Sequence, residues 1–148
     1  MNMRRILLAV LLGLFLFMHS VVAGAGASGK GRVCFRGECF ELEVVSSPED
    51  RSRGLMFRES LARSAGMLFV FEEKGVYPFW MKNTLIPLDI IWIDSSGRVV
   101  DIKENAQPCK EGLCPDYVPA GRADRVLELN AGSVKRTGLR VGDTVRLL

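Results

Sequence analysis

The chain has 148 residues, 48% of them hydrophobic, and its 20 basic residues against 17 acidic ones give a formal net charge of +3. Two of the basic residues lie within residues 1–23, so residues 24–148 carry a net charge of only +1, which gives no electrostatic reason to bind nucleic acid or an anionic membrane surface. The one histidine, His19, also lies within residues 1–23, which excludes serine-histidine triads, histidine-bound zinc and histidine general bases from the rest of the chain.

Residues 1–23 have the layout of a secretory signal peptide. A basic start precedes an unbroken apolar run over residues 6–18, and Val21 and Ala23 occupy the positions that signal peptidase reads. We therefore expect cleavage after Ala23 and export to a periplasmic or extracellular location. The alternative is an uncleaved segment that anchors the domain on the outer face of the cytoplasmic membrane, although His19 interrupts the run before the ~20 residues that spanning requires.

The rest of the chain is predicted to form one domain. Residues 24–31 are mostly small and indicate a flexible linker. Residues 32–148 are enough for one modest hydrophobic core, and the sequence has no internal repeat, heptad pattern or low-complexity tract that would argue for another architecture.

Four cysteines form two pairs with the same spacing, Cys34 with Cys39 and Cys109 with Cys114. In an exported chain an even number of cysteines indicates disulfides. A two-residue turn would place Cys34 opposite Cys39 in a hairpin, where Cα atoms lie ~4.5 Å apart and a disulfide can form. Two alternatives stay open: crossed pairing, and four thiolates around one zinc ion, which an oxidising compartment disfavours.

Most of the predicted elements are short strands. A β-hairpin is expected over residues 33–45, followed by a short helix that Ser47 caps and Gly54 ends. Apolar runs bounded by turn signals predict further strands over residues 67–71, 77–84, 88–94, 98–105, 126–130 and 143–148. One helical turn is expected within residues 131–138.

Residues 106–123 form a long predicted loop that holds three of the six prolines and the second cysteine pair. Loops of this length in a compact domain are usually functional or closed by a bridge. The elements together predict an α+β fold that is mainly β, a curled antiparallel sheet or partly closed barrel of about seven strands with one or two short helices.

Five motifs follow one another along the chain, at residues 53–58 (RGLMFR), 66–69 (GMLF), 80–84 (WMKNT), 87–89 (PLD) and 126–132 (VLELNAG). With these motifs the chain resembles the domain of unknown function 192 (DUF192) family of small, frequently exported prokaryotic proteins. The resemblance implies a single compact β-rich domain and no established activity. Cys34 and Cys39 lie outside the motifs, so the resemblance implies nothing about their pairing.

The most informative stretch is residues 79–89, where polar side chains interrupt an apolar run. Buried polar groups need partners or face a ligand, and aromatic walls with a few polar groups are typical of small-molecule pockets. The predicted ligand site consists of Arg58, Trp80, Lys82, Asn83, Thr84 and Asp89. In the alternative interpretation, Asn83 and Thr84 bond to local backbone and Pro87 shapes a turn.

Two arginines, Arg53 and Arg58, bracket an apolar motif and are suited to clamping an anionic ligand with bidentate hydrogen bonds. The simpler interpretation pairs either of them with Asp89 or Glu128, which each lie between apolar neighbours in a predicted strand. Such an ion pair would serve the fold and not a ligand.

A catalytic role is the competing hypothesis. Asp89 with Lys82 would act as an acid and base pair on a sugar or ester, but no nucleophile stands beside them in the sequence. Glycoside hydrolysis needs two carboxylates close together, and the sequence does not place Asp89 against Glu104 or Glu128.

Metal binding has one candidate set, the methionines Met56, Met67 and Met81, because thioethers are soft ligands for Cu(I). Methionine is also a common core residue, which accounts for all three without a metal. We therefore expect neither a metal nor another cofactor.

The sequence thus predicts an exported, non-enzymatic binding or accessory module with its polar and aromatic site in residues 79–89. The expected partner is an unknown small molecule or an envelope protein, with no nucleic acid, and a membrane only if residues 1–23 stay uncleaved. The alternatives are a hydrolase that uses Asp89 with Lys82 and a structural partner of an envelope complex.

Overall fold

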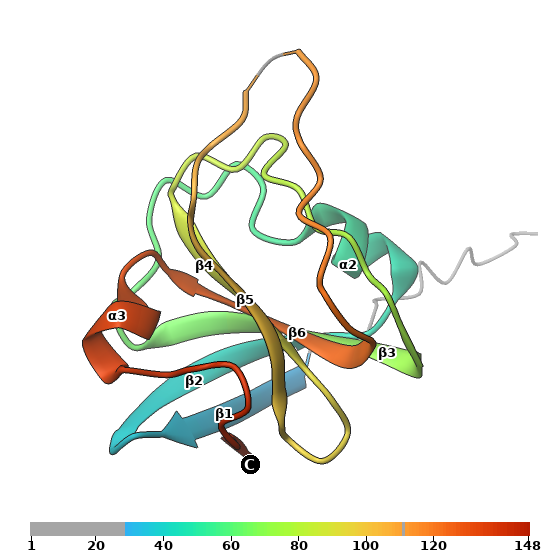
Figure 1. Cartoon of the computed structure of the whole chain (residues 1–148). Helices are drawn as coiled ribbons and strands as arrows, with labels where there is room; N and C mark the ends of the chain where they lie inside the picture. The colour runs from blue at the N-terminus through green and yellow to red at the C-terminus, as the bar shows by residue number, and fades with distance from the viewer. Residues whose placement is uncertain (1–28, 111) are drawn as a thin grey trace, which may run out of the picture.

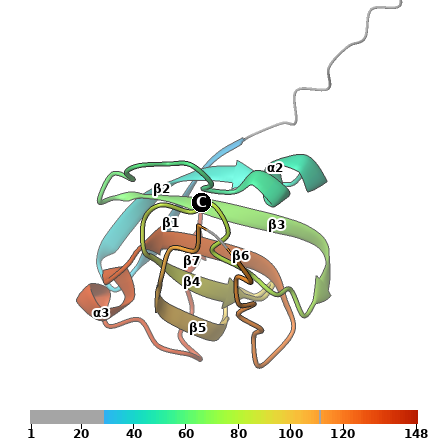
Figure 2. The ribbon, with the colours of Figure 1, turned by 90° about the horizontal axis from the view of Figure 1, so that it is seen from above.

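The computed structural model describes residues 29–110 and 112–148. In this part of the chain, seven strands form one curled sheet with two short helices beside it (Figures 1 and 2). The predicted signal peptide over residues 1–23 lies outside the described residues, as do residues 24–28 of the predicted linker. Across the described ranges, no helix combines the length and apolar character needed to cross a membrane.

The elements in chain order are β1 (Gly29–Phe35), β2 (Glu38–Val45), α2 (Pro48–Arg53), β3 (Ala65–Gly75), β4 (Leu88–Ile93), β5 (Val99–Ala106), β6 (Ala123–Asn130), α3 (Ser133–Thr137) and β7 (Arg146–Leu147). Their order across the sheet is β5-β4-β6-β3-β2-β1-β7. The Val99 N–H donates to the Asp143 carbonyl and the Val145 N–H to the Gly97 carbonyl, each at 2.8 Å, which joins the start of β5 and the turn before it to the segment before β7. The predicted mainly β, α+β fold with a partly closed barrel is confirmed.

One pairing in the sheet, that of β2 with β3, is parallel, while the others are antiparallel. Parallel neighbours need a crossover connection of a dozen residues or more, and residues 46–64, which contain α2, supply it. The sheet is therefore mixed and not wholly antiparallel as predicted. The sequence predicts this six-residue helix from its caps, but a local cap pattern does not reveal which strands the helix connects.

The predicted linker ends earlier than expected. β1 begins at Gly29 and pairs there with Val44 of β2, so residues 29–31 are strand and not linker. The physical reason is the length of β2, whose eight residues offer backbone partners well beyond the hairpin turn. Small residues can occupy this end of β1 because the pairing with β2 uses backbone groups and not side chains.

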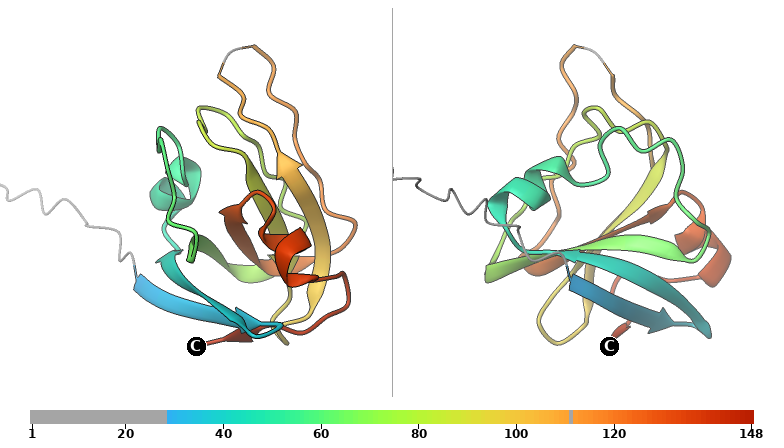
Figure 3. Two further views of the ribbon diagram at one scale, coloured as in Figure 1. Left: turned by 90° about the vertical axis from the view of Figure 1, so that its left-hand side faces the viewer. Right: turned by 180° about the vertical axis from the view of Figure 1, so that it is seen from behind.

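Residues 77–84 do not form the predicted strand. In the described part of the chain, their sheet-like contacts are two isolated bridges, Phe79 with Tyr117 and Lys82 with Cys109. Pro78 has no N–H to donate, and Asn83 has a left-handed φ of 56°, so the segment cannot continue a regular ladder. It runs instead beside the long loop that follows β5, as the side view in Figure 3 shows.

The structure contains two local disulfides, Cys34–Cys39 with Cα atoms 4.1 Å apart and Cys109–Cys114 with Cα atoms 5.8 Å apart. The turn between the first two cysteines has positive φ at both Arg36 and Gly37, as a tight hairpin requires. All four thiols are consumed in these bonds. Crossed pairing and a four-thiolate zinc site are therefore both excluded by this structure.

Separate apolar clusters cover the two faces of the sheet. Side chains alternate between faces along a strand, so Ile91 of β4 and Leu127 of β6 join a first core, while Ile90 and Val126 join a second core on the opposite face. All six residues of β4 are buried. An acidic side chain on β4 or the middle of β6 therefore points into a core whichever face it takes.

Asp89 is one such side chain, and backbone groups satisfy it. It is fully buried and lies directly opposite Leu129, which places it on the face of the first core. The Asn105 N–H donates to its Oδ1 at 2.9 Å, and the Val134 N–H donates to its Oδ2 at 2.8 Å. The carboxylate therefore fastens the end of β5 and the start of α3 to β4.

Replacing Asp89 is expected to destabilise the fold strongly. Asp89→Ala leaves the buried Val134 N–H and the part-buried Asn105 N–H without an acceptor, at a cost of about 2–5 kcal/mol in the free energy of unfolding. Urea denaturation measures the loss. The matched control is Asp116→Ala, since Asp116 is an exposed carboxylate in the long loop, and its change should stay within about 0.5 kcal/mol. Equal stability of the two variants would contradict the structural role of Asp89.

Candidate functional site

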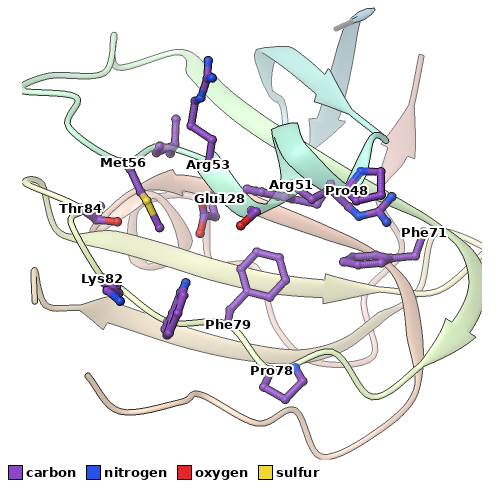
Figure 4. A pocket seen from close by; sticks show the side chains of 15 residues that line it. Pro48, Arg51, Arg53, Met56, Phe71, Pro78, Phe79, Lys82, Thr84 and Glu128 are labelled. Carbon is purple, nitrogen blue, oxygen red and sulfur yellow. The ribbon is translucent and has the colours of Figure 1, made fainter. Parts of the chain in front are cut away.

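A pocket of about 320 Å³ lies against β3 and β6, on the face of the second core, between α2 and residues 78–84 (Figure 4). Three separate parts of the chain build it: the helix and the turn after it, the central strands, and the irregular segment 78–84. Of the predicted ligand residues, the pocket brings together Trp80, Lys82 and Thr84. It adds Glu128 from β6, which the sequence suggested only as an ion-pair partner.

Aromatic rings form much of the wall. Phe69 and Phe71 come from β3, and Phe79 and Trp80 come from the irregular segment. Phe69 and Phe79 meet edge to face with ring centroids 4.9 Å apart, and Phe79 also meets Trp92 edge to face at 6.2 Å. These contacts to core rings fix the position of Phe79, so this part of the wall is rigid.

The wall segment is held in place by backbone hydrogen bonds to its neighbours. Phe79 and Tyr117 exchange two hydrogen bonds of 3.0 and 2.7 Å, and the Asn83 N–H donates to the Cys109 carbonyl at 2.9 Å. The Asn83 carbonyl in turn accepts the Phe57 N–H at 2.8 Å. The long loop, closed by its own disulfide, therefore braces one side of the pocket wall.

The carboxyl group of Glu128 faces the pocket from its floor (Figure 4). Glu128 is only 4% exposed, and among the described residues its side chain has no hydrogen bond or ion pair. Burial raises the pKa of Glu128 to about 8, because desolvation penalises the charged form. At neutral pH the floor of the pocket is therefore a neutral carboxylic acid that can donate one hydrogen bond and accept others.

Basic side chains surround this floor. Lys82 places its Nζ 5.2 Å from the ring centroid of Trp80 and has no carboxylate partner in the described ranges. Arg51 lies over Phe71, with Cζ 4.8 Å from the ring centroid, and its Nη1 donates to the carbonyls of Ser46 and Val70. Arg53 also lines the pocket, but its guanidinium points away from Glu128 in Figure 4. The pocket therefore carries net positive charge at neutral pH.

The remaining predicted ligand residues lie elsewhere. Arg58 forms a bidentate ion pair with Glu43, at 2.5 and 2.6 Å, and hydrogen bonding by Arg58 lowers the pKa of that carboxyl. Asn83 contributes backbone hydrogen bonds to the wall, in keeping with the alternative interpretation of that residue. Asp89 is committed to backbone N–H groups on the other face of the sheet. The structure thus pairs Arg58 with neither Asp89 nor Glu128, which corrects the simpler interpretation of the arginines.

The two carboxylates in the central strands lie on opposite faces of the sheet. Asp89 is paired with Leu129 and Ile90 with Glu128, so Glu128 shares its face with Ile90 and the second core. A carboxylate pair acting across one substrate needs both groups on one side. Asp89 and Glu128 therefore cannot act together, and Glu104 is exposed on β5.

The three methionines divide between the second core and the lining of the pocket. Met67 and Met81 are buried in the second core with 2% and 1% of their surfaces exposed, while Met56 lines the pocket. Within the described ranges no group of three or more histidine, cysteine or acidic side chains stands close enough to hold a metal ion. Packing accounts for Met67 and Met81.

Sequence reasoning missed two ionisable members of the pocket, Arg51 and Glu128, as ligand residues. Arg51 gave no signal beyond its place in the last turn of a short helix. Glu128 did give one, since it stands between Leu127 and Leu129 in a predicted strand. In a sheet with one solvated face, such a residue simply points to water. A glutamate between two leucines in a strand indicates a buried carboxyl only when both faces of the sheet are covered by apolar clusters.

Comparison with known proteins agrees with the fold. The family model DUF192, described as an uncharacterised ACR, matches residues 32–147. A crystal structure of a protein of unknown function from Novosphingobium aromaticivorans is 36% identical, with a TM-score of 0.72, covering 80% of this chain and 84% of that one. A candidate transcription regulator from Sinorhizobium meliloti is 39% identical, with a TM-score of 0.71, covering 80% and 94%. No curated protein matches the chain.

The unpartnered carboxyl predicts a pH-dependent stability. Since the folded pKa of about 8 exceeds the ordinary value of 4.5, the native state keeps a proton that the unfolded state releases. The free energy of unfolding should therefore fall as pH rises from about 4.5 to 8, by at most about 5 kcal/mol. In Glu128→Gln this part of the pH dependence should vanish, and the variant should be more stable than the wild type at about pH 8.

Urea denaturation between about pH 5 and pH 9 measures both effects. The matched control is Glu104→Gln, because Glu104 is an exposed residue of β5, and it should keep the wild-type pH dependence. Parallel curves for the wild type and Glu128→Gln would show that Glu128 ionises normally in the folded protein.

Proposed function

The chain belongs to the domain of unknown function 192 family, and we propose that it is an exported, non-enzymatic module that binds a small molecule in the Glu128 pocket. One observation carries the proposal: the carboxyl of Glu128 is almost wholly buried, faces the pocket and lacks a partner among the described residues. Buried polar side chains in folded proteins are nearly always hydrogen-bonded. A bound molecule would supply the missing hydrogen bond.

The shape and chemistry of the pocket support a small ligand. Its volume of about 320 Å³ lies at the lower end of the range for small-molecule sites. Rigid aromatic rings line it, and a few polar groups converge on it, which is the usual composition of such sites. Trp80, Lys82 and Thr84 belong to one motif of the family, so a single segment supplies all three of the predicted ligand residues that line the pocket.

A hydrolase role receives less support. In that hypothesis Asp89 works with Lys82, but both carboxylate oxygens of Asp89 already accept backbone N–H groups in the first core. Lys82 lines a pocket on the opposite face of the sheet. A binding role is compatible with Lys82 in the pocket and Asp89 in the first core. The hydrolase role would require Asp89 to break its hydrogen bonds to the backbone.

Export is part of the proposal and has independent support. Disulfides persist mainly in oxidising compartments outside the cytoplasm, and the structure contains two. The relative from Sinorhizobium meliloti is named for transcription regulation, a role that usually needs a basic DNA-binding surface. Residues 24–148 have a net charge of only +1, so we do not extend that role to this chain.

The export proposal predicts the mass of the protein in its own cells. The denatured protein should have the mass of residues 24–148 less four hydrogens, since cleavage after Ala23 removes the leader and each of the two disulfides removes two hydrogens. Intact mass spectrometry of protein purified from the envelope fraction checks this. A mass that includes residues 1–23 would favour the membrane anchor, and four free thiols would argue against an oxidising location.

The binding proposal predicts an added mass. Native mass spectrometry of the chain purified from its own cells should reveal a small ligand that is absent from the denatured spectrum. Lys82→Ala should lose at least about 80% of this adduct while keeping the wild-type melting temperature, because Lys82 is exposed and its ammonium lies over the Trp80 ring without an ion-pair partner among the described residues.

Lys103→Ala is the matched control for this experiment. Lys103 is also exposed and lies 5.1 Å from the ring centroid of Tyr117, outside the pocket. Its removal should leave the adduct unchanged. An adduct that survives equally in both variants lies elsewhere on the chain, and a wild-type protein that carries none under gentle native conditions would count against a tightly bound ligand.

A further inference from the structure

The charge around the pocket constrains the ligand. The charged side chains that line the pocket around Glu128 come from two elements, Arg51 and Arg53 from α2 and Lys82 from segment 78–84, and of these the Arg53 guanidinium points away from Glu128. The adjoining rungs of β3 and β4 carry Met67 and Ile90, which do not titrate. The lining thus holds three cationic side chains and one carboxyl. A cationic ligand would be repelled by this set, whereas an anion would be attracted to it.

The positions of the cations favour a single small anionic group near the mouth of the pocket. Lys82 has three N–H donors and, in the described part of the chain, no carboxylate to receive them. Arg51 is held over Phe71 by two backbone carbonyls that bind its Nη1, which keeps the guanidinium in place. The ligand's anionic group can therefore meet a positioned charge without reorganising the protein.

The aromatic walls favour a flat ring as the body of the ligand. Phe79 is fixed between Phe69 and Trp92, and Trp80 presents a half-exposed indole that the Lys82 ammonium covers from one side. Aromatic side chains pack favourably against planar rings. A ring entering this pocket would bury against the fixed ring of Phe79, which loses little conformational freedom on binding.

We propose that the Glu128 pocket binds a small aromatic carboxylate, whose ring packs against Phe79 and Trp80 and whose carboxylate accepts hydrogen bonds from Lys82 and from the carboxyl group of Glu128. This inference rests on the proposed function and names the ligand class for the same site. A carboxylic acid beside a carboxylate forms a strong, charge-assisted hydrogen bond. The buried, unpartnered carboxyl of Glu128 can therefore donate a hydrogen bond to the ligand, which a permanently ionised carboxylate cannot do.

The proposal predicts that the affinity for the ligand depends on pH. Burial raises the pKa of Glu128 to about 8, so the donor is present at neutral pH and is lost when Glu128 ionises. Above that pH two carboxylates would face each other, and like charges disfavour the complex. The affinity for an aromatic carboxylate should therefore fall as pH rises through about 8. A cationic ring compound such as benzylammonium would show the opposite trend, because the ionised Glu128 would attract its ammonium group.

Three probes with the same ring test this on the full chain purified from its own cells: benzoate, benzamide and benzylammonium. Binding is measured by calorimetry or by chemical-shift titration. At about pH 6.5 benzoate should bind at least about tenfold more tightly than benzamide, and benzylammonium most weakly. Between about pH 6.5 and 9.5 the benzoate affinity of the wild type should fall about tenfold or more, while the benzamide affinity stays nearly constant.

Matched variants separate the two contacts. Glu128→Gln keeps an N–H donor at every pH, so its benzoate affinity should no longer fall with pH, whereas Glu104→Gln should behave as the wild type. Lys82→Ala should weaken benzoate binding about fivefold or more and leave benzamide binding within about twofold, because only the carboxylate uses the ammonium. Lys103→Ala should change neither.

Equal or tighter binding of benzamide or benzylammonium would overturn the carboxylate inference and leave the pocket a binding site for another class of ligand. A native adduct identified as something other than an aromatic carboxylate would do the same. If no probe binds, the inference also fails, and the native mass spectrum then decides the proposed function separately, since that experiment does not depend on the choice of probe.

Discussion

The burial of both faces of the central strands is the constraint on which the rest of this structure depends. β4 and the middle of β6 have no solvated side, so each polar side chain there must be satisfied inside the protein or by something bound to it. Two acidic residues, Asp89 and Glu128, occupy such positions on neighbouring strands and opposite faces. Because their surroundings differ, Asp89 stabilises the first core, whereas Glu128 belongs to the candidate binding site.

Asp89 and Glu128 illustrate two solutions to one physical problem. Asp89 remains buried because β5 and α3 bring two backbone N–H groups to its oxygens, so the carboxylate becomes a structural link. No such donor reaches Glu128 within the described residues, and burial instead keeps it protonated at neutral pH. Perturbed groups of this kind gather at functional sites because other positions would be filled by an apolar residue at lower cost.

The pocket around Glu128 exists because an irregular segment is held against a regular sheet. Residues 78–84 lack a strand of their own, and a loop closed by the Cys109–Cys114 disulfide supplies the backbone partners that a neighbouring strand would normally provide. This arrangement leaves the side chains of Trp80 and Lys82 free to line a cavity. The second disulfide therefore acts on the site through the wall that it braces, while the Cys34–Cys39 bond secures a distant hairpin.

The sequence by itself determined the features that depend on neighbouring residues. The Cys34–Cys39 hairpin and the helix between Ser47 and Gly54 followed from local spacing and composition, and the aromatic and polar pattern of residues 79–89 predicted a site in the segment that supplies Trp80, Lys82 and Thr84 to the pocket. Only the tertiary structure decided that β2 and β3 run parallel, that residues 77–84 pair with a loop, and that Asp89 and Glu128 face opposite ways. Strand alternation tells which residues share a face, but whether that face meets water or a second core depends on segments far away in the chain.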